Sequence, residues 1–280
     1  MQLLKYIIPI LLVVTISCTS DDDPIEPINE IEGLTKVQEI SNNIHTIELF
    51  TESGKLMQGY NDITLRIMNK NSKAYIQNAS INWKPMMHMT SMMHSCPKSS
   101  ITKMADKETL YNGFIIFQMA ENADEKWDLT FNYTIDGSEY EAKAGITVPA
   151  TEKKVVASFM GTDGARYVVA LVAPKNPEVK VNDIVAGIYK MENMMTFPEV
   201  TNYKLMLDPR MPSMGNHSSP NNEDLTYDAA SKMYKGKLSL TMTGYWKLNL
   251  MLVNNNSEML KGEEVTDENE SSSLFLELEF

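Results

Sequence analysis

Methionine and histidine concentrate in one short stretch of this chain. The 280 residues include 21 methionines but only four histidines, and residues 86–94 hold five of the methionines and two of the histidines. Thioether sulfur is a soft neutral ligand and imidazole is a borderline one, so together they suit Cu(I), and imidazole also serves Cu(II). Thioethers also persist as ligands outside the cytosol, where a thiol is easily oxidised. The stretch therefore predicts a copper site.

The same pattern recurs in the second half of the chain. The segment MTSMMHSCP from Met89 to Pro97 is matched by MPSMGNHSSP from Met211 to Pro220, with one inserted residue. Recurrence favours a shared role over chance. The candidate metal ligands that follow from this match are Met89, Met92, His94, Met211, Met214 and His217.

Two further methionines hold matching positions. Met119 and Met242 each stand eight residues beyond a tyrosine, at the end of an alternating run and before a tryptophan. Each is either a core residue or a ligand at the end of its strand. Possible extra ligands of the first copy are Met86, His88 and Cys96, and Cys96 is equally well a lone exposed thiol. We assign His45, which lies in a strand pattern, a structural role.

Other functions remain open at this point. Methionine is an adaptable apolar residue, so the two stretches could instead contact a protein partner in a structural or adhesive protein. A third hypothesis is that the chain is an accessory subunit of a transporter or a cytochrome oxidase. The sequence shows no recognisable hydrolase spacing and no glycine-rich phosphate loop, so we expect a binding protein rather than an enzyme.

The elements that must position these residues are β-strands. Alternating runs after Tyr111 and Tyr234, and from Trp127 and Trp246, have the period of half-buried antiparallel strands. Further strands are expected near residues 44–50, 62–68, 75–83 and 139–148, and near residues 154–160, 166–173, 183–190, 203–207 and 273–280. Six or seven strands per hundred residues are typical of an immunoglobulin-like sandwich. We therefore expect two tandem sandwiches, module 1 over residues 36–150 and module 2 over residues 153–280.

The order of these motifs resembles the YtkA-like and FixH-like families of small exported β-sandwich modules. The resemblance covers roughly residues 60–135 and 182–253, and it is closer in the second copy. There Asn216 separates Met214-Gly215 from His217, whereas the first copy lacks the glycine after Met92. The resemblance implies copper handling by exported or membrane-tethered proteins.

The first residues predict export and a lipid anchor. Residues 1–17 have the short apolar core of a signal peptide, and Thr15-Ile16-Ser17-Cys18 resembles a lipobox in which Cys18 is lipidated. We expect the acidic segment 18–35 that follows to be an unfolded tether. Its acidic run also resembles the surface-export signal of Bacteroidota lipoproteins. We expect an outer membrane lipoprotein, at the cell surface or facing the periplasm, with a copper donor or acceptor protein as its partner.

Charge and cysteine content restrict the remaining classes. The net charge is −12, so the chain has no electrostatic basis for binding nucleic acid. Its other cysteine is Cys96, so lipidation of Cys18 leaves no intramolecular disulfide. The modules must then be held by their hydrophobic cores.

Overall fold

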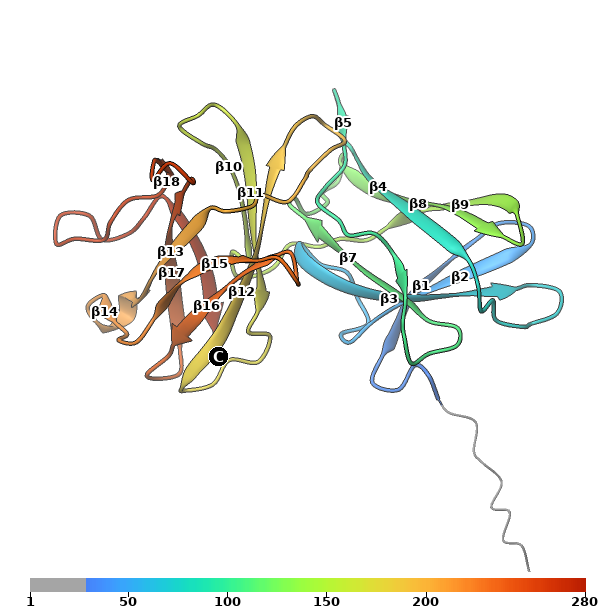
Figure 1. Ribbon diagram of the computed structural model, residues 1–280, viewed down its shortest axis with the longest axis horizontal. Coiled ribbons are helices and arrows are strands. Elements are labelled where there is room, and N and C mark those ends of the chain that lie inside the picture. The colour runs from blue at the N-terminus through green and yellow to red at the C-terminus, as the bar shows by residue number, and fades with distance from the viewer. Residues whose placement is uncertain (1–28) are drawn as a thin grey trace, which may run out of the picture.

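A computed structural model describes residues 29–280 and shows an all-β protein (Figure 1). The expected signal peptide and the expected lipidation site, Cys18, lie outside the described residues. Within residues 29–280, none of the helical structure is long and apolar enough to span a bilayer. Strands account for the regular structure apart from one 3-10 turn, Pro212–Met214.

Module 1 is a sandwich of two antiparallel sheets. The first sheet contains, in spatial order, β1 (Thr35–Ser41), β2 (His45–Thr51), β3 (Gly59–Asn69), β7 (Tyr111–Phe117) and β6 (Thr102–Lys103). The facing sheet contains β5 (Met93–His94), β4 (Ser80–His88), β8 (Lys126–Ile135) and β9 (Ser138–Ile146). Their inner faces meet in one core that includes Trp83, Trp127 and Phe131.

Module 2 repeats this strand order. One layer runs β10 (Val156–Met160), β11 (Arg166–Ala173), β12 (Val181–Met191), β16 (Met233–Ser239) and β15 (Glu223–Asp228). The other contains β14 (His217–Ser218), β13 (Lys204–Met211), β17 (Tyr245–Val253) and β19 (Leu274–Glu279), with a short added strand β18 (Met259–Lys261). Because β15 pairs with both β16 and β13, the two layers are joined by hydrogen bonds.

This order is that of an immunoglobulin-like sandwich. Strands β2, β3, β7 and β6 take the positions A, B, E and D, and β5, β4, β8 and β9 take the positions C′, C, F and G. Trp83 on β4 is buried, where immunoglobulin domains carry their strand-C tryptophan. Its indole nitrogen donates to the carbonyl oxygen of Ser99 at 2.8 Å. The expected all-β, immunoglobulin-like fold class is confirmed.

The internal repeat extends to single hydrogen bonds. Asn61 accepts from the amide of Met57 at 2.9 Å and donates to its carbonyl oxygen at 2.7 Å. Asn182 does the same with Glu178, at 3.0 and 2.8 Å. Each asparagine thus closes the loop that leads into β3 or β12, which explains why this residue recurs at both sites.

The two modules have separate cores and meet in a third, smaller apolar cluster. Ile116 on β7 packs there with Val168 on β11 and Tyr189 on β12. A Cβ added at Gly187 would lie 3.3 Å from the Cδ1 atom of Ile116, so β12 approaches module 1 closely. Burial of this cluster holds β10, β11 and β12 against module 1.

Two sequence-based expectations differ from the structure. The strand expected at residues 75–83 is β4, which runs from Ser80 to His88 and so includes residues 86–88 of the methionine-rich stretch. The acidic tether was expected to extend to residue 35. Instead, residues 30–33 form a turn, and Glu30 accepts hydrogen bonds from the backbone amides of Glu108 and Thr109.

Candidate metal site between the two modules

The methionine-rich stretch of module 1 is a β-hairpin. Its strands β4 and β5 pair Met87 with His94 and His88 with Met93. The amide of Met89 donates to the carbonyl oxygen of Met92 at 3.0 Å, which closes the turn. Since side chains alternate along strands, Met87 is buried in the core. The methionines of the turn are at least partly exposed.

The turn lies over a cavity of about 410 Å³ that both modules line. Module 1 contributes Met89, Met92, His94 and Met119, which are all four of its principal candidate ligands. Module 2 contributes two methionines that sequence reasoning missed, Met191 and Met194. In Figure 1, β5 of module 1 lies beside the loop between β12 and β13 of module 2.

His94 is held in one orientation at this cavity. Its side chain is only 6% exposed, and Nδ1 lies 2.7 Å from the carbonyl oxygen of Ser95. A carbonyl oxygen can only accept, so Nδ1 carries the proton and donates it. In the neutral ring the lone pair is then on Nε2, the atom that would bind a metal. The ring also packs edge-on against Trp127, with centroids 5.7 Å apart.

Gln118 lines the cavity next to His94 and forms a hydrogen bond there. Its Nε2 donates to the carbonyl oxygen of Ser95 at 3.0 Å and lies 3.2 Å from Nδ1 of His94. The bond to Ser95 is the one that holds, because a protonated Nδ1 cannot accept a second proton. Oε1 of Gln118 is buried and has no hydrogen-bond partner among the described residues.

Met119 is positioned by the tryptophan that follows it. The indole nitrogen of Trp127 donates to the carbonyl oxygen of Met119 at 3.1 Å. In module 2, Trp246 makes the same bond to Met242 at 3.0 Å. The spacing of methionine and tryptophan differs, eight residues in module 1 and four in module 2, but the same hydrogen bond fixes the backbone of each methionine just after its strand, β7 or β16.

The corresponding residues of module 2 lie in different surroundings. Met211 is 2% exposed in the core, and its methyl group lies 3.4 Å from where a Cβ at Gly244 would stand. Met214 is 56% exposed on the 3-10 turn, and His217 is exposed on β14. Met242 packs against the core of module 2.

Strand pairing also corrects the alignment of the two copies. Met211 pairs with His217 as Met87 pairs with His94, so Met211 corresponds to Met87 rather than to Met89. The hairpin of module 1 has one more residue between its paired methionine and histidine than the hairpin of module 2 has. The sequence alignment instead placed the extra residue in module 2.

The possible extra ligands lie apart from the cavity. Met86 is buried on the other face of β4, and Nε2 of His88 contacts the carboxylate of Asp128. That carboxylate also pairs with Lys143 at 2.9 Å. Cys96 is buried in the module 1 core, so the expected exposed thiol is wrong, and burial raises the pKa of the Cys96 thiol well above its usual value.

The candidate ligands of the cavity are neutral. Its lining holds methionines, one histidine and the cationic residue Arg166, but no carboxylate, so no anionic ligand offsets the charge of a bound cation. Among residues 29–280, no group of three or more His, Cys, Asp or Glu side chains is arranged to hold a metal. Any metal held here must depend on methionine sulfur, which Zn²⁺ and other harder divalent ions bind poorly.

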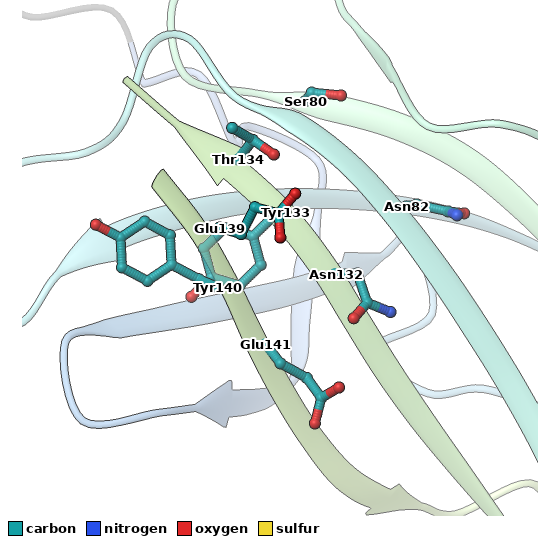
Figure 2. A pocket seen from close by; sticks show the side chains of 8 residues that line it. All are labelled: Ser80, Asn82, Asn132, Tyr133, Thr134, Glu139, Tyr140 and Glu141. Carbon is teal, nitrogen blue, oxygen red and sulfur yellow. The ribbon is translucent and has the colours of Figure 1, made fainter. Parts of the chain in front are cut away.

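A second hollow, on the sheet of β4, β8 and β9, has a different character (Figure 2). Its lining is polar and comes from adjacent strand positions, among them Asn82, Asn132 and Glu141. Tyr133 and Tyr140 stack beneath it with ring centroids 5.5 Å apart. It contains none of the candidate ligands.

Comparison with known proteins identifies no family for this chain. No protein-family model and no curated protein sequence matches it. Among solved structures, it is similar to a chimeric titin Z1Z2 tandem carrying a fibronectin GRGDS peptide, at 12% identity and a TM-score of 0.17, covering 80% of this chain and 93% of that one. It is also similar to an endo-fucoidan hydrolase of glycoside hydrolase family 107, at 11% identity and a TM-score of 0.20, covering 80% of this chain and 37% of that one. Both scores are low, so the fold assignment rests on the strand order.

Proposed function

We propose that this chain binds Cu(I) in the cavity between its modules, as an exported copper chaperone, scavenger or sensor. The ligands are the thioethers of Met89, Met92 and Met119 and Nε2 of His94. One observation carries the proposal: these four residues come from two separate segments of the chain, residues 89–94 and Met119, yet all of them line one cavity without a carboxylate. Soft neutral ligands of this kind favour Cu(I).

The cellular setting is part of the same proposal. Lipidation at Cys18 would tether the modules to the outer membrane, and a separate protein would donate or accept the copper. The motifs resemble those of the YtkA-like and FixH-like modules, which would suit this setting, but no family model supports the resemblance. The set Met211, Met214, His217 and Met242 is a second candidate site, although the burial of Met211 favours the cavity between the modules.

A second candidate function is the binding of a protein partner to the methionine surface. Met92, Met93 and Met194 are 47%, 54% and 44% exposed, so they offer adaptable apolar area. A docking surface needs apolar area and tolerates leucine, whereas a metal site needs sulfur. Methionine-to-leucine changes therefore separate the two functions.

The test is a competition titration of the full chain against a chromogenic Cu(I) chelator. We expect the triple variant M89L/M92L/M119L to lose Cu(I) affinity by more than about a hundredfold, because three soft ligands are removed at nearly constant side-chain volume. M160L/M259L, which changes two exposed methionines outside the cavity and outside the second candidate set, is the control and should bind like wild type. Equal binding by wild type and the triple variant would refute the copper site and favour partner docking.

A further inference from the structure

Module 2 supplies two of the methionines that line the cavity. Met191 ends β12, and Met194 lies in the turn that follows it. We propose that thioethers of Met191 and Met194 share the shell of the same Cu(I), which holds at most four ligands, with His94 and the module 1 methionines, so that the bound ion ties the two modules together. This inference rests on the copper proposal and deepens it: the complete site would exist only in the docked pair of modules.

A backbone hydrogen bond brings the two ligand sets together. The amide of Ser95 donates to the carbonyl oxygen of Met194 at 2.7 Å, from module 1 to module 2. Because Ser95 follows His94, this bond fixes Met194 next to the candidate imidazole ligand. Ser95 is itself held, since its hydroxyl is buried and donates to the carbonyl oxygen of Pro85 at 2.9 Å.

The turn that carries Met194 is also defined by its own bonds. The amide of Glu192 donates to the carbonyl oxygen of Thr196 at 3.1 Å, and the amide of Met195 donates to Oδ1 of Asn193 at 2.8 Å. These bonds close a short loop with Met194 at its tip, while Met195 does not line the cavity. The two adjacent methionines are thus nearly equal in exposure but differ in position, which makes Met195 a matched control.

The base of the site is already closed by apolar packing. Val168 and Phe197 line the cavity and belong to the cluster that joins the modules around Ile116. A metal bound above this cluster would add its ligand bonds to an interface that exists without it. The ion would therefore strengthen the docking of the modules rather than create it.

Linkage gives the size of the effect. An ion that binds the docked modules more tightly than the undocked ones shifts the docking equilibrium by at most the ratio of the two affinities. If loss of Met191 and Met194 weakens binding about tenfold, saturating Cu(I) raises the ratio of docked to undocked chains by up to about tenfold. Bound copper would thus reduce the motion of one module relative to the other.

The experiment compares the full wild-type chain with M191L/M194L and with the control M195L. In a Cu(I) competition titration, we expect M191L/M194L to bind at least about tenfold more weakly, since each tenfold corresponds to about 1.4 kcal/mol of lost ligand energy. M195L should match wild type. Hydrogen exchange of the Ser95 amide gives a second readout: Cu(I) should slow it in wild type and in M195L, and should leave it unchanged in M191L/M194L.

The outcomes distinguish the two proposals. If wild type binds Cu(I) and M191L/M194L binds it equally well, the link between the modules is refuted while the copper site in module 1 stands. If wild type fails to bind Cu(I), both proposals fall. Circular dichroism of the metal-free variants checks folding, and the single variants M191L and M194L serve if the double variant unfolds.

Discussion

At the scale of single residues, polar groups buried in module 1 make its stability depend on pH. His45 is buried, its Nδ1 lies 3.2 Å from the hydroxyl of Tyr133, and its ring packs edge-on against Tyr140. Desolvation lowers the pKa of His45 below its ordinary value of 6.5. Its expected structural role is consistent with these contacts.

We expect His45 to weaken the fold in mild acid. Below pH 6.5 the unfolded chain takes up a proton on His45 before the folded chain does, so stability falls as the pH drops towards the lower folded pKa. The loss in free energy of unfolding between about pH 7.5 and pH 5.5 should be smaller in H45Q than in wild type. Denaturant unfolding at both pH values measures it, and equal losses in the two proteins would contradict this account.

Glu48 is a second buried group with a strong local effect. Burial alone would raise the pKa of its carboxyl, but hydrogen bonds from Lys36 and from Arg66, whose Nε lies 2.6 Å away, hold the pKa below its ordinary value. We expect E48Q to destabilise the chain by about 3 kcal/mol, because Arg66 loses its partner in a mostly buried position.

The pH dependence of E48Q has a defined sign. The stabilisation by Glu48 is complete above its unfolded pKa, close to 4.5, and it is lost as the pH falls through the lower folded value. The difference between wild type and E48Q should therefore shrink in acid. Glu39, which pairs with Lys36 at the surface, is the matched control, and E39Q should cost less than about 1 kcal/mol. A difference that stayed constant down to strongly acidic pH would refute the role of ionised Glu48.

At the scale of elements, the loops before β3 and β12 depend on equivalent asparagines. Asn61 and Asn182 each bond both backbone groups of the residue four positions earlier. We expect N61A and N182A each to lower the free energy of unfolding by about 2 kcal/mol, because several partly buried backbone groups lose their partner. Chemical denaturation of both variants measures it. A large loss for one and none for the other would show that the two loops are not equivalent.

The sequence predicted elements best where their pattern was strong. The alternation after Trp127 and Trp246 correctly indicated β8 and β17. The sequence analysis missed β1 and β15, because each of these strands has only one buried residue and so lacks a clear apolar period. The sequence analysis also ended β4 too early, because Pro85 and the methionines that follow it are typical of a loop. In the structure, these residues pair with β8.

The candidate site was predictable only in part. Repetition drew attention to Met89, Met92 and His94, and the strand-end position drew attention to Met119. Met191 and Met194 lack such a signal, because only the docking of the modules brings them to the cavity. Sequence periodicity reports contacts within one sandwich, whereas contacts between two sandwiches follow no short period.

At the scale of the whole molecule, each module should fold alone but more weakly. Fragments 29–150 and 153–280 each retain a complete strand set and a separate core. We expect both to give cooperative thermal unfolding by circular dichroism, at lower temperatures than the full chain, because the cluster of Ile116, Val168 and Tyr189 becomes exposed. Mixed at high concentration, the fragments should recover part of the lost stability. Unfolded fragments would contradict the division into two modules.

The central claim is that methionines of both modules bind copper, and copper X-ray absorption of the selenomethionine-labelled full chain tests it most directly. Selenium in place of sulfur marks each ligand that comes from methionine. We predict a copper coordination shell dominated by selenium, with a nitrogen contribution from His94, and fewer selenium neighbours in M191L/M194L. A shell of nitrogen and oxygen alone, with no selenium neighbour, would contradict the proposed site.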